Sequence, residues 1–146
     1  MHYAVNQPLR RDVLQPASRQ LRLFPSSLRH GSQLTWEEFK NAAPELAALG
    51  EERFEATGLV LVGTLRKNGW PRISPVEPLF ADGQLYLGMM WQSRKALDLK
   101  WDSRCTVHNT VVDLDAIDGD FKVYGRADEV TDLEARRRYC DALLLG

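Results

Sequence analysis

The sequence predicts a mainly β fold with flanking helices, built as a small antiparallel barrel. Five short segments have the composition of strands, and most of them follow one another directly, with one helix inserted. The links at Asn68-Gly69 and Asp82-Gly83 carry residue pairs typical of tight hairpin turns. Sequence-adjacent strands joined in this way favour antiparallel pairing over the parallel sheet of an α/β protein.

Residues 1–34 read as a basic, flexible extension in front of the folded domain, residues 35–146. This segment has a single acid, Asp12, and five arginines among prolines and serines: Arg10, Arg11, Arg19, Arg22 and Arg29. Such a composition favours a mobile arm. An organellar transit peptide or a mis-assigned start codon would give the same pattern.

The folded domain is expected to begin with helices. Thr35 and Glu38 form a capping-box pattern, in which each side chain satisfies an amide at the helix start. Apolar residues then recur at helical spacing: Trp36, Phe39, Ala43, Leu46, Leu49 and Phe54. Pro44 predicts a break into two short helices.

The predicted strands begin with a three-stranded meander, residues 59–65, 72–80 and 84–89. Pro75 and Pro78 cannot donate to a ladder, so the second strand should lie at a sheet edge or carry a bulge for part of its length. Two further strands are expected at residues 105–111 and 121–127. A second capping box, Thr131 to Glu134, predicts a helix through Leu144.

Composition limits the classes of function. The chain has 146 residues, 44% of them hydrophobic, which suits one domain. A formal net charge of −1 provides no overall field for nucleic acid or anionic membrane, and no apolar run approaches the ~20 residues that span a bilayer. Cys105 and Cys140 are far apart, which argues against a disulfide framework or zinc site and fits a reducing, cytoplasmic setting.

Ser93-Arg94-Lys95 is the strongest candidate for a binding site. Ser93 is a good N-cap for the helix-forming residues that follow, yet two cations at a helix N-terminus oppose the helix dipole. Amides, a hydroxyl, a guanidinium and an ammonium on one turn would make a cradle for a phosphate. Alternatively, the segment is a solvated surface turn.

Arg72 and Ser74 supply the second half of this candidate site. They share one face of the second meander strand, and the third strand leads directly to Ser93. If adjacent strands pair, that face lies near the helix start, and one anion site forms in an otherwise near-neutral protein. Read alone, Arg72 could equally be an edge-strand charge that discourages aggregation.

Four ordered motifs within residues 35–144 resemble the pyridoxamine 5'-phosphate oxidase-like family, the FMN-binding split β-barrel superfamily. They are Gly69-Trp70-Pro71-Arg72-Ile73-Ser74-Pro75, Gly88-Met89-Met90, Ser93-Arg94-Lys95-Ala96 and Lys122-Val123-Tyr124-Gly125-Arg126-Ala127. The resemblance implies a six-stranded antiparallel Greek-key barrel, usually a homodimer, with a flavin or deazaflavin bound between subunits. By the same resemblance Arg72, Ser93, Arg94 and Lys95 contact the FMN phosphate, and Ser74, Gly88 and Met89 line the cofactor cleft.

Two departures qualify the resemblance. Glu77 stands where a pyridoxamine phosphate oxidase is expected to carry a lysine for its substrate's phosphate, so vitamin B6 synthesis is not expected. Family members continue from the last helix into a final strand that closes the barrel. Here that strand is missing from the printed sequence, which predicts an unpaired sheet edge and puts activity in doubt.

These observations leave three hypotheses. The first is an FMN-binding oxidoreductase acting on a small-molecule substrate, with no catalytic residue identified because the cofactor supplies the hydride chemistry. The second is an F420-dependent reductase that uses the same turn. The third is a non-catalytic barrel that stores or senses flavin or haem.

Two further features of the sequence each have two interpretations. Lys122, Tyr124 and Arg126 share one strand face, which is either a nucleotide or deazaflavin-tail contact or a solvated face. His108, the only histidine of the folded region, could be an acid or a haem ligand, but a lone strand histidine is more often structural.

Overall fold

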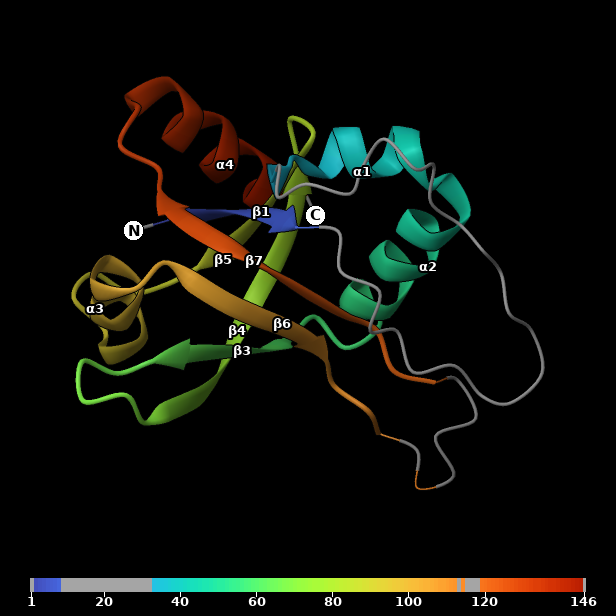
Figure 1. Cartoon of the computed structure of the whole chain (residues 1–146). Coiled ribbons are helices and arrows are strands. Elements are labelled where there is room, and N and C mark those ends of the chain that lie inside the picture. Colours follow the sequence, from blue (N-terminus) through green and yellow to red (C-terminus); the bar gives the residue numbers. More distant parts are fainter. Residues whose placement is uncertain (1, 9–32, 113, 115–118, 146) are drawn as a thin grey trace.

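The computed structural model describes residues 2–8, 33–112, 114 and 119–145, and it has a curled antiparallel sheet with helices around it (Figure 1). The strands are β1 (His2–Pro8), β2 (Gln33–Leu34), β3 (Val60–Leu65), β4 (Pro71–Ala81), β5 (Gln84–Gly88), β6 (Arg104–Asn109) and β7 (Lys122–Glu129). The helices are α1 (Trp36–Ala42), α2 (Pro44–Glu55), α3 (Arg94–Trp101) and α4 (Leu133–Leu145). The predicted mainly β class with flanking helices is confirmed.

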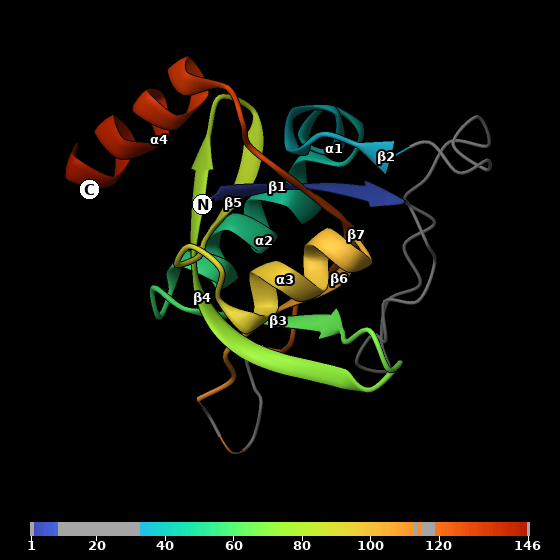
Figure 2. The ribbon, with the colours of Figure 1, turned by 90° about the vertical axis from the view of Figure 1, so that its left-hand side faces the viewer.

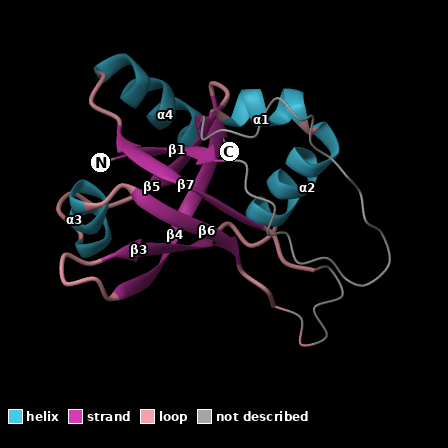
Figure 3. Cartoon of the chain, viewed as in Figure 1, coloured by secondary structure: helices cyan, strands magenta, loops and turns pink. Residues whose placement is uncertain are grey.

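The sheet has the order β2-β1-β5-β4-β3-β6-β7. Five of its strands, β5-β4-β3-β6-β7, form a half-barrel, and the helices lie around it (Figure 3). The predicted meander is present as β3, β4 and β5. Both glycines of the predicted hairpin turns take the left-handed backbone that those turns require, with φ of 84° at Gly69 and 68° at Gly83.

The long, bent strand β4 accommodates its prolines by changing partners along its length. Its first half pairs with β3, where Pro75 faces Leu61, and its second half pairs with β5, where Pro78 faces Leu87. Each proline therefore lies where β4 pairs on one side only within the described sheet. The predicted partial edge is confirmed, and Figure 2 shows the resulting curvature of β4.

Residues 2–8 differ from the predicted flexible extension. His2–Pro8 forms strand β1, which pairs antiparallel with β5 and also with β7. Val5, for example, pairs with Leu85 on one side and with Ala127 on the other. Strand β1 thus occupies the gap between the two outer strands of the half-barrel, so the expectation of an unpaired edge there is wrong. Gln33–Leu34, at the end of the predicted extension, forms β2 and pairs with β1, and residue 1 and residues 9–32 lie outside the described residues.

The helix boundaries follow local signals. Thr35 caps α1 through the predicted capping box, and Pro44 begins α2 as the sequence indicates. In α4, however, Asp132 takes the capping role, because its Oδ2 accepts a 2.7 Å hydrogen bond from the amide of Ala135. The helix accordingly begins two residues after Thr131, and the prediction of a Thr131 capping box is wrong.

The core lies between α1, α2 and the inner face of the sheet. Five aromatic residues make its ring contacts: Trp36, Phe39, Phe54, Phe80 and Phe121. The predicted packing of α1 is confirmed, but Leu49 is 39% exposed and Gly50 is buried in its place. None of the described helices combines the length and apolar character that a membrane-spanning helix requires.

Candidate anion-binding site

The candidate site is centred on the start of α3, which follows a tight turn after β5. The amide of Ser93 donates to the carbonyl of Met90 at 3.1 Å, and Gln92 has a φ of 52°. Ser93 then adopts an extended backbone, and its carbonyl accepts the first helical hydrogen bond, from the amide of Leu97 at 3.0 Å. Ser93 therefore has the backbone of an N-cap residue.

The side chain of Ser93 does not cap the helix. Its Oγ is buried, yet it has no hydrogen-bond partner among the residues that the structure describes. An unpaired buried hydroxyl costs roughly 1–3 kcal/mol, and such orphan groups are rare in native structures. This hydroxyl is available to a ligand that accepts a hydrogen bond at the helix start.

Two cations lie on the first turn of the same helix. Arg94 is exposed, and no ion pair joins it to any acid in the described part of the chain. Lys95 folds against β4, where its Nζ donates to the carbonyl of Pro75 at 3.0 Å. That contact places the lysine beside the strand that carries Arg72, and it uses one of the three donors of the ammonium group.

Arg72 reaches the same helix from β4. Its Nε donates to Oδ2 of Asp98 at 2.6 Å, and the hydroxyl of Thr64 donates to the same oxygen at 2.9 Å. Thr64 and Arg72 are direct partners in the β3–β4 ladder, so their side chains share a face. The ion pair with Asp98 occupies only one edge of the guanidinium.

The four charged groups suit a doubly charged anion. Arg72, Arg94 and Lys95 are cations, and Asp98 contributes one negative charge, which leaves two positive charges on α3 and the adjacent part of β4. A phosphate monoester carries about −1.5 to −2 charges at pH 7. The helix N-terminus adds a further partial positive charge. The residues present therefore fit a phosphate group in both charge and donor type.

The remaining predicted site residues fall in two places. Ser74 is half-buried and lies on the β4 face of Arg72 and Val76, as period-two alternation predicts. Gly88 lies beneath α4 instead, because a Cβ added there would be 2.8 Å from Oη of Tyr139. Met89 is only 6% exposed and belongs to the hydrophobic core. Gly88 and Met89 are thus covered by the protein's own core and α4.

Sequence reasoning missed Asp98 and Thr64. Asp98 follows Arg94 by four residues, so both residues lie on the same side of α3, and it is the single acid of this helix. Thr64 is the ladder partner of Arg72, whereas a symmetric count from a two-residue Asn68-Gly69 turn would pair it with Ile73. The signal at Asp98 was present in the sequence but becomes specific only once α3 is placed against β3, and the partner of Thr64 follows only from the observed register.

The surface around the site contains apolar side chains. Met90 and Trp91 precede Ser93 and are 80% and 65% exposed, and Leu97 and Trp101 are exposed on α3 itself. Nζ of Lys100 lies 5.3 Å from the centre of a Trp91 ring, a cation–π contact. The α3 side of the molecule therefore combines aromatic groups with positive charge.

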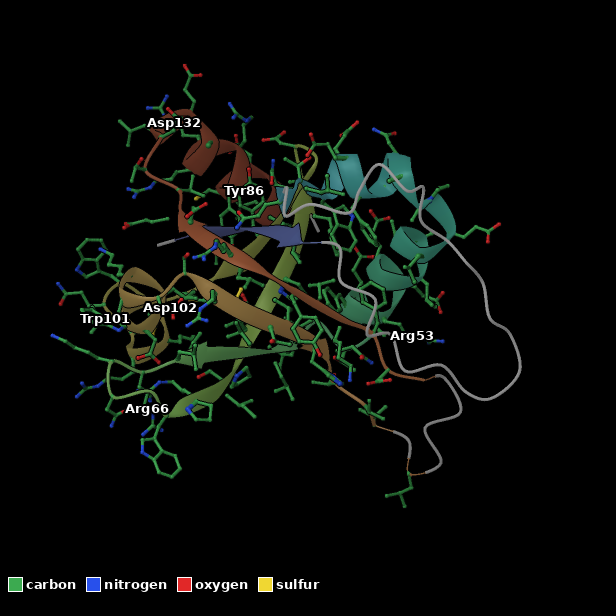
Figure 4. The ribbon with its side chains drawn as sticks, viewed as in Figure 1. Arg53, Arg66, Tyr86, Trp101, Asp102 and Asp132 are labelled. Carbon is green, nitrogen blue, oxygen red and sulfur yellow. The ribbon has the colours of Figure 1, made fainter. Side chains whose placement is uncertain are left out.

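A shallow cavity of about 360 Å³ lies at the other end of α3 and contains none of the predicted site residues. Trp101 and Asp102 lie at this end of the helix, and Arg66 lies in the neighbouring β3–β4 hairpin (Figure 4). The cavity is lined partly by Lys100, Arg126 and Glu129, and Lys100 pairs with Glu129 at 3.1 Å. Its charges are thus of both signs.

Strand β7 presents the predicted polar face. Lys122, Tyr124 and Arg126 alternate with buried residues along the strand. Lys122 pairs with Asp120 at 2.6 Å, which lowers the pKa of that carboxyl, and Nη1 of Arg126 donates to the hydroxyl of Ser103 at 2.9 Å. Nε2 of His108 also lies 3.3 Å from Asp120. These groups form surface pairs on the sheet.

Among the described residues, no group of three or more histidine, cysteine, aspartate or glutamate side chains is arranged to hold a metal ion. Comparisons with protein-family models, with curated proteins and with solved structures found no match to this chain.

Proposed function

We propose that this chain binds FMN and acts as an oxidoreductase of the pyridoxamine 5'-phosphate oxidase-like type, not in vitamin B6 synthesis. The observation that carries the proposal is the cluster at the start of α3. There the buried, unpartnered hydroxyl of Ser93 lies at the head of the helix that bears Arg94 and Lys95 and contacts Arg72. FMN, when bound, supplies the hydride chemistry, and the protein's part is to hold and orient it.

The charge at the site favours FMN over F420. FMN ends in a phosphate monoester, which carries close to two negative charges at neutral pH. The phosphate of F420 is a diester and carries one. Two net positive charges from Arg72, Arg94, Lys95 and Asp98 match the monoester more closely.

The proposal includes a split-barrel fold and a homodimer. The antiparallel meander, together with β1 between β5 and β7, is compatible with a six-stranded barrel. In a single chain the start of α3 lies at the surface, beside exposed Met90 and Trp91. A second copy over this surface would cover both the apolar side chains and the cofactor's ring.

The ligand is identified most directly from the purified protein. A visible absorption spectrum, followed by mass spectrometry of the released ligand, separates flavin, deazaflavin and haem. FMN is the expected result. If the protein binds none of these groups after reconstitution, the proposal is wrong.

The phosphate contacts are tested by a matched pair of double variants. Arg94→Ala with Lys95→Ala should weaken FMN binding by about 100-fold or more, since hydrogen bonds to charged groups contribute roughly 1.5–3 kcal/mol each. Riboflavin has no phosphate, so its affinity should change little. Arg66→Ala with Lys67→Ala removes an exposed Arg-Lys pair from the β3–β4 hairpin and is the control. Equal losses for both ligands would mean that the α3 turn is structural.

The dimer has its own measurement. Sedimentation velocity of the FMN-bound protein should give twice the mass of one chain. A monomer that binds FMN tightly would contradict the shared site.

A further inference from the structure

Asp98 is a buried acid with a defined pair of partners. It is 7% exposed, and a single oxygen, Oδ2, accepts from both Nε of Arg72 and the hydroxyl of Thr64. A buried carboxylate is costly unless it is paired and hydrogen-bonded. The partners come from two adjacent strands, so Asp98 fastens α3 to the β3–β4 ladder at one point.

This contact determines how the guanidinium of Arg72 can point. Nε lies on one edge of the planar group, and the two Nη atoms lie away from that bond. With Nε held by Asp98, rotation of the plane is restricted and the Nη donors remain for a ligand. No other partner of the Arg72 side chain is found in the part of the chain that the structure describes.

Asp98 also lies one turn after the two helix cations. Arg94 precedes it by four residues and Lys95 by three, and Lys95 reaches β4 at Pro75, three residues from Arg72. The ion pair therefore sets the spacing between the cation on the strand and those on the helix. Phosphate recognition by several cations depends on that spacing.

We propose that Asp98, supported by Thr64, is the positioning residue of the phosphate site: it holds Arg72 so that its Nη groups face the anion bound at the start of α3. This inference rests on the proposed function for the identity of the ligand, FMN. The positioning role of Asp98 applies to any phosphate bound at this site, whether or not that phosphate belongs to FMN.

A purely electrostatic view of Asp98 leads to the opposite expectation. A negative charge beside an anion site repels the anion, so removing it should tighten binding. A positioning role predicts weaker binding on removal, because Arg72 loses its fixed orientation. The sign of the change separates the two roles.

The experiment uses Asp98→Asn and Thr64→Val in the full chain. The first variant removes the charge, and the second removes only the supporting hydrogen bond while the charge stays. Asp102→Asn is the matched control, because it removes a carboxylate from the end of the same helix, where it pairs with Arg104. Titrations with FMN, riboflavin and inorganic phosphate give the affinities, and circular dichroism confirms that each variant is folded.

The orientation of Arg72 is measured independently of any ligand. In the wild-type protein the Nε–H proton of Arg72 should give a slowly exchanging NMR signal, assigned by its loss in Arg72→Lys. Both Asp98→Asn and Thr64→Val should speed its exchange, and Asp102→Asn should leave it unchanged. This readout detects positioning even if a variant binds flavin poorly for other reasons.

We expect Asp98→Asn to weaken the binding of FMN and of inorganic phosphate by about tenfold or more, and Thr64→Val to weaken both by several-fold. The affinity for riboflavin should change little in either variant. Tighter or unchanged phosphate binding in Asp98→Asn would overturn the inference, even with FMN bound normally. Wild-type protein that binds inorganic phosphate at this site but no flavin would refute the proposed function alone, with the phosphate titrations still deciding the role of Asp98. Wild-type protein that binds neither ligand would refute both.

Discussion

The ring of Phe121 packs directly on the backbone of Gly50, in the middle of α2. A Cβ added at Gly50 would lie 2.5 Å from Cζ and 2.6 Å from Cε1 of that ring. Phe121 is 7% exposed and also makes an edge contact with Phe54 on the same helix. Glycine is a poor residue for a helix interior, and its presence here is explained by the close approach of the ring.

Gly50→Ala should therefore destabilise the protein. Alanine improves helix propensity by about 1 kcal/mol, but overpacking against a buried ring typically costs about 1–3 kcal/mol, and Phe121 is buried against Phe54. Urea unfolding followed by circular dichroism measures the net effect. Combining the substitution with Phe121→Leu should cost less than the sum of the two single changes. A gain of about 1 kcal/mol for Gly50→Ala would show that the ring moves freely.

Ser93→Ala and Thr35→Ala should separate a binding hydroxyl from a capping one. The hydroxyl of Thr35 accepts from the amide of Glu38 at 3.2 Å, so its loss should cost about 0.5–2 kcal/mol of stability. Oγ of Ser93 makes no such bond, so removing this buried, unpaired hydroxyl should not destabilise the ligand-free protein and should stabilise it by up to about 1–3 kcal/mol.

Affinity for FMN should respond in the reverse order. Ser93→Ala should weaken it by roughly tenfold or more, because a hydrogen bond to a charged group is lost, and Thr35→Ala should leave it unchanged. Thermal unfolding and FMN titration of the same samples make the comparison. Equal destabilisation by the two substitutions would identify Ser93 as an ordinary cap.

The two cysteines should react very differently. Burial raises the pKa of Cys105 to about 12, so almost no thiolate forms near neutral pH. Cys140 is exposed on α4. Iodoacetamide at pH 8 should label one thiol per folded chain and two after unfolding, as counted by mass spectrometry of the intact protein. Rapid labelling of both thiols in the folded state would mean that β6 opens readily.

The Asp102–Arg104 pair should contribute to stability only above acidic pH. Hydrogen bonds from Arg104 lower the pKa of Asp102 to about 2, below its ordinary value of 3.8. Because the folded-state pKa is the lower one, the contribution is full above pH 3.8 and is lost as the pH falls toward 2. Asp102→Asn should be slightly less stable than wild type at pH 7, since the pair is exposed, and indistinguishable from it below pH 2. A difference that persists well below pH 2 would need another cause.

Much of the fold was predictable because its signals are local. The meander follows from two turn pairs and from alternation, and Thr35 and Pro44 set the starts of α1 and α2 through their own side chains. The one-sided pairing of β4 at Pro75 and Pro78 follows from their missing amide donors. Each of these features depends on residues within a few positions of one another, which is the range in which sequence patterns are reliable.

The features that sequence reasoning missed depend on distant partners. Strand β1 pairs with β5 and β7, and no local pattern in residues 2–8 indicates that it pairs with those strands. The arginines and prolines that follow it gave the whole segment the composition of a flexible arm. Gly88 and Met89 were placed in a cleft by motif alone, whereas α4 and the core cover them.

The candidate site also combines residues with local sequence signals and residues whose roles depend on distant partners. Ser93, Arg94 and Lys95 are adjacent, and Arg72 was brought near them by simple strand alternation. Asp98 needed the packing of α3 on the sheet, since its role depends on Arg72, which is 26 residues away along the chain. Asp98 is visible in the sequence as an acid on an otherwise basic helix turn, but no sequence pattern indicates its partner.

The position of β1 between β5 and β7 has a consequence for synthesis on the ribosome. Residues 2–8 leave the exit tunnel well before residues 122–129, which form one of their three ladders. Until then only β2 and β5 can pair with β1, and the edge of β1 that later pairs with β7 is open to other chains. The pairing of β1 with β7 is therefore a late, long-range event, and the first of the described strands to be made is among the last to be fully paired.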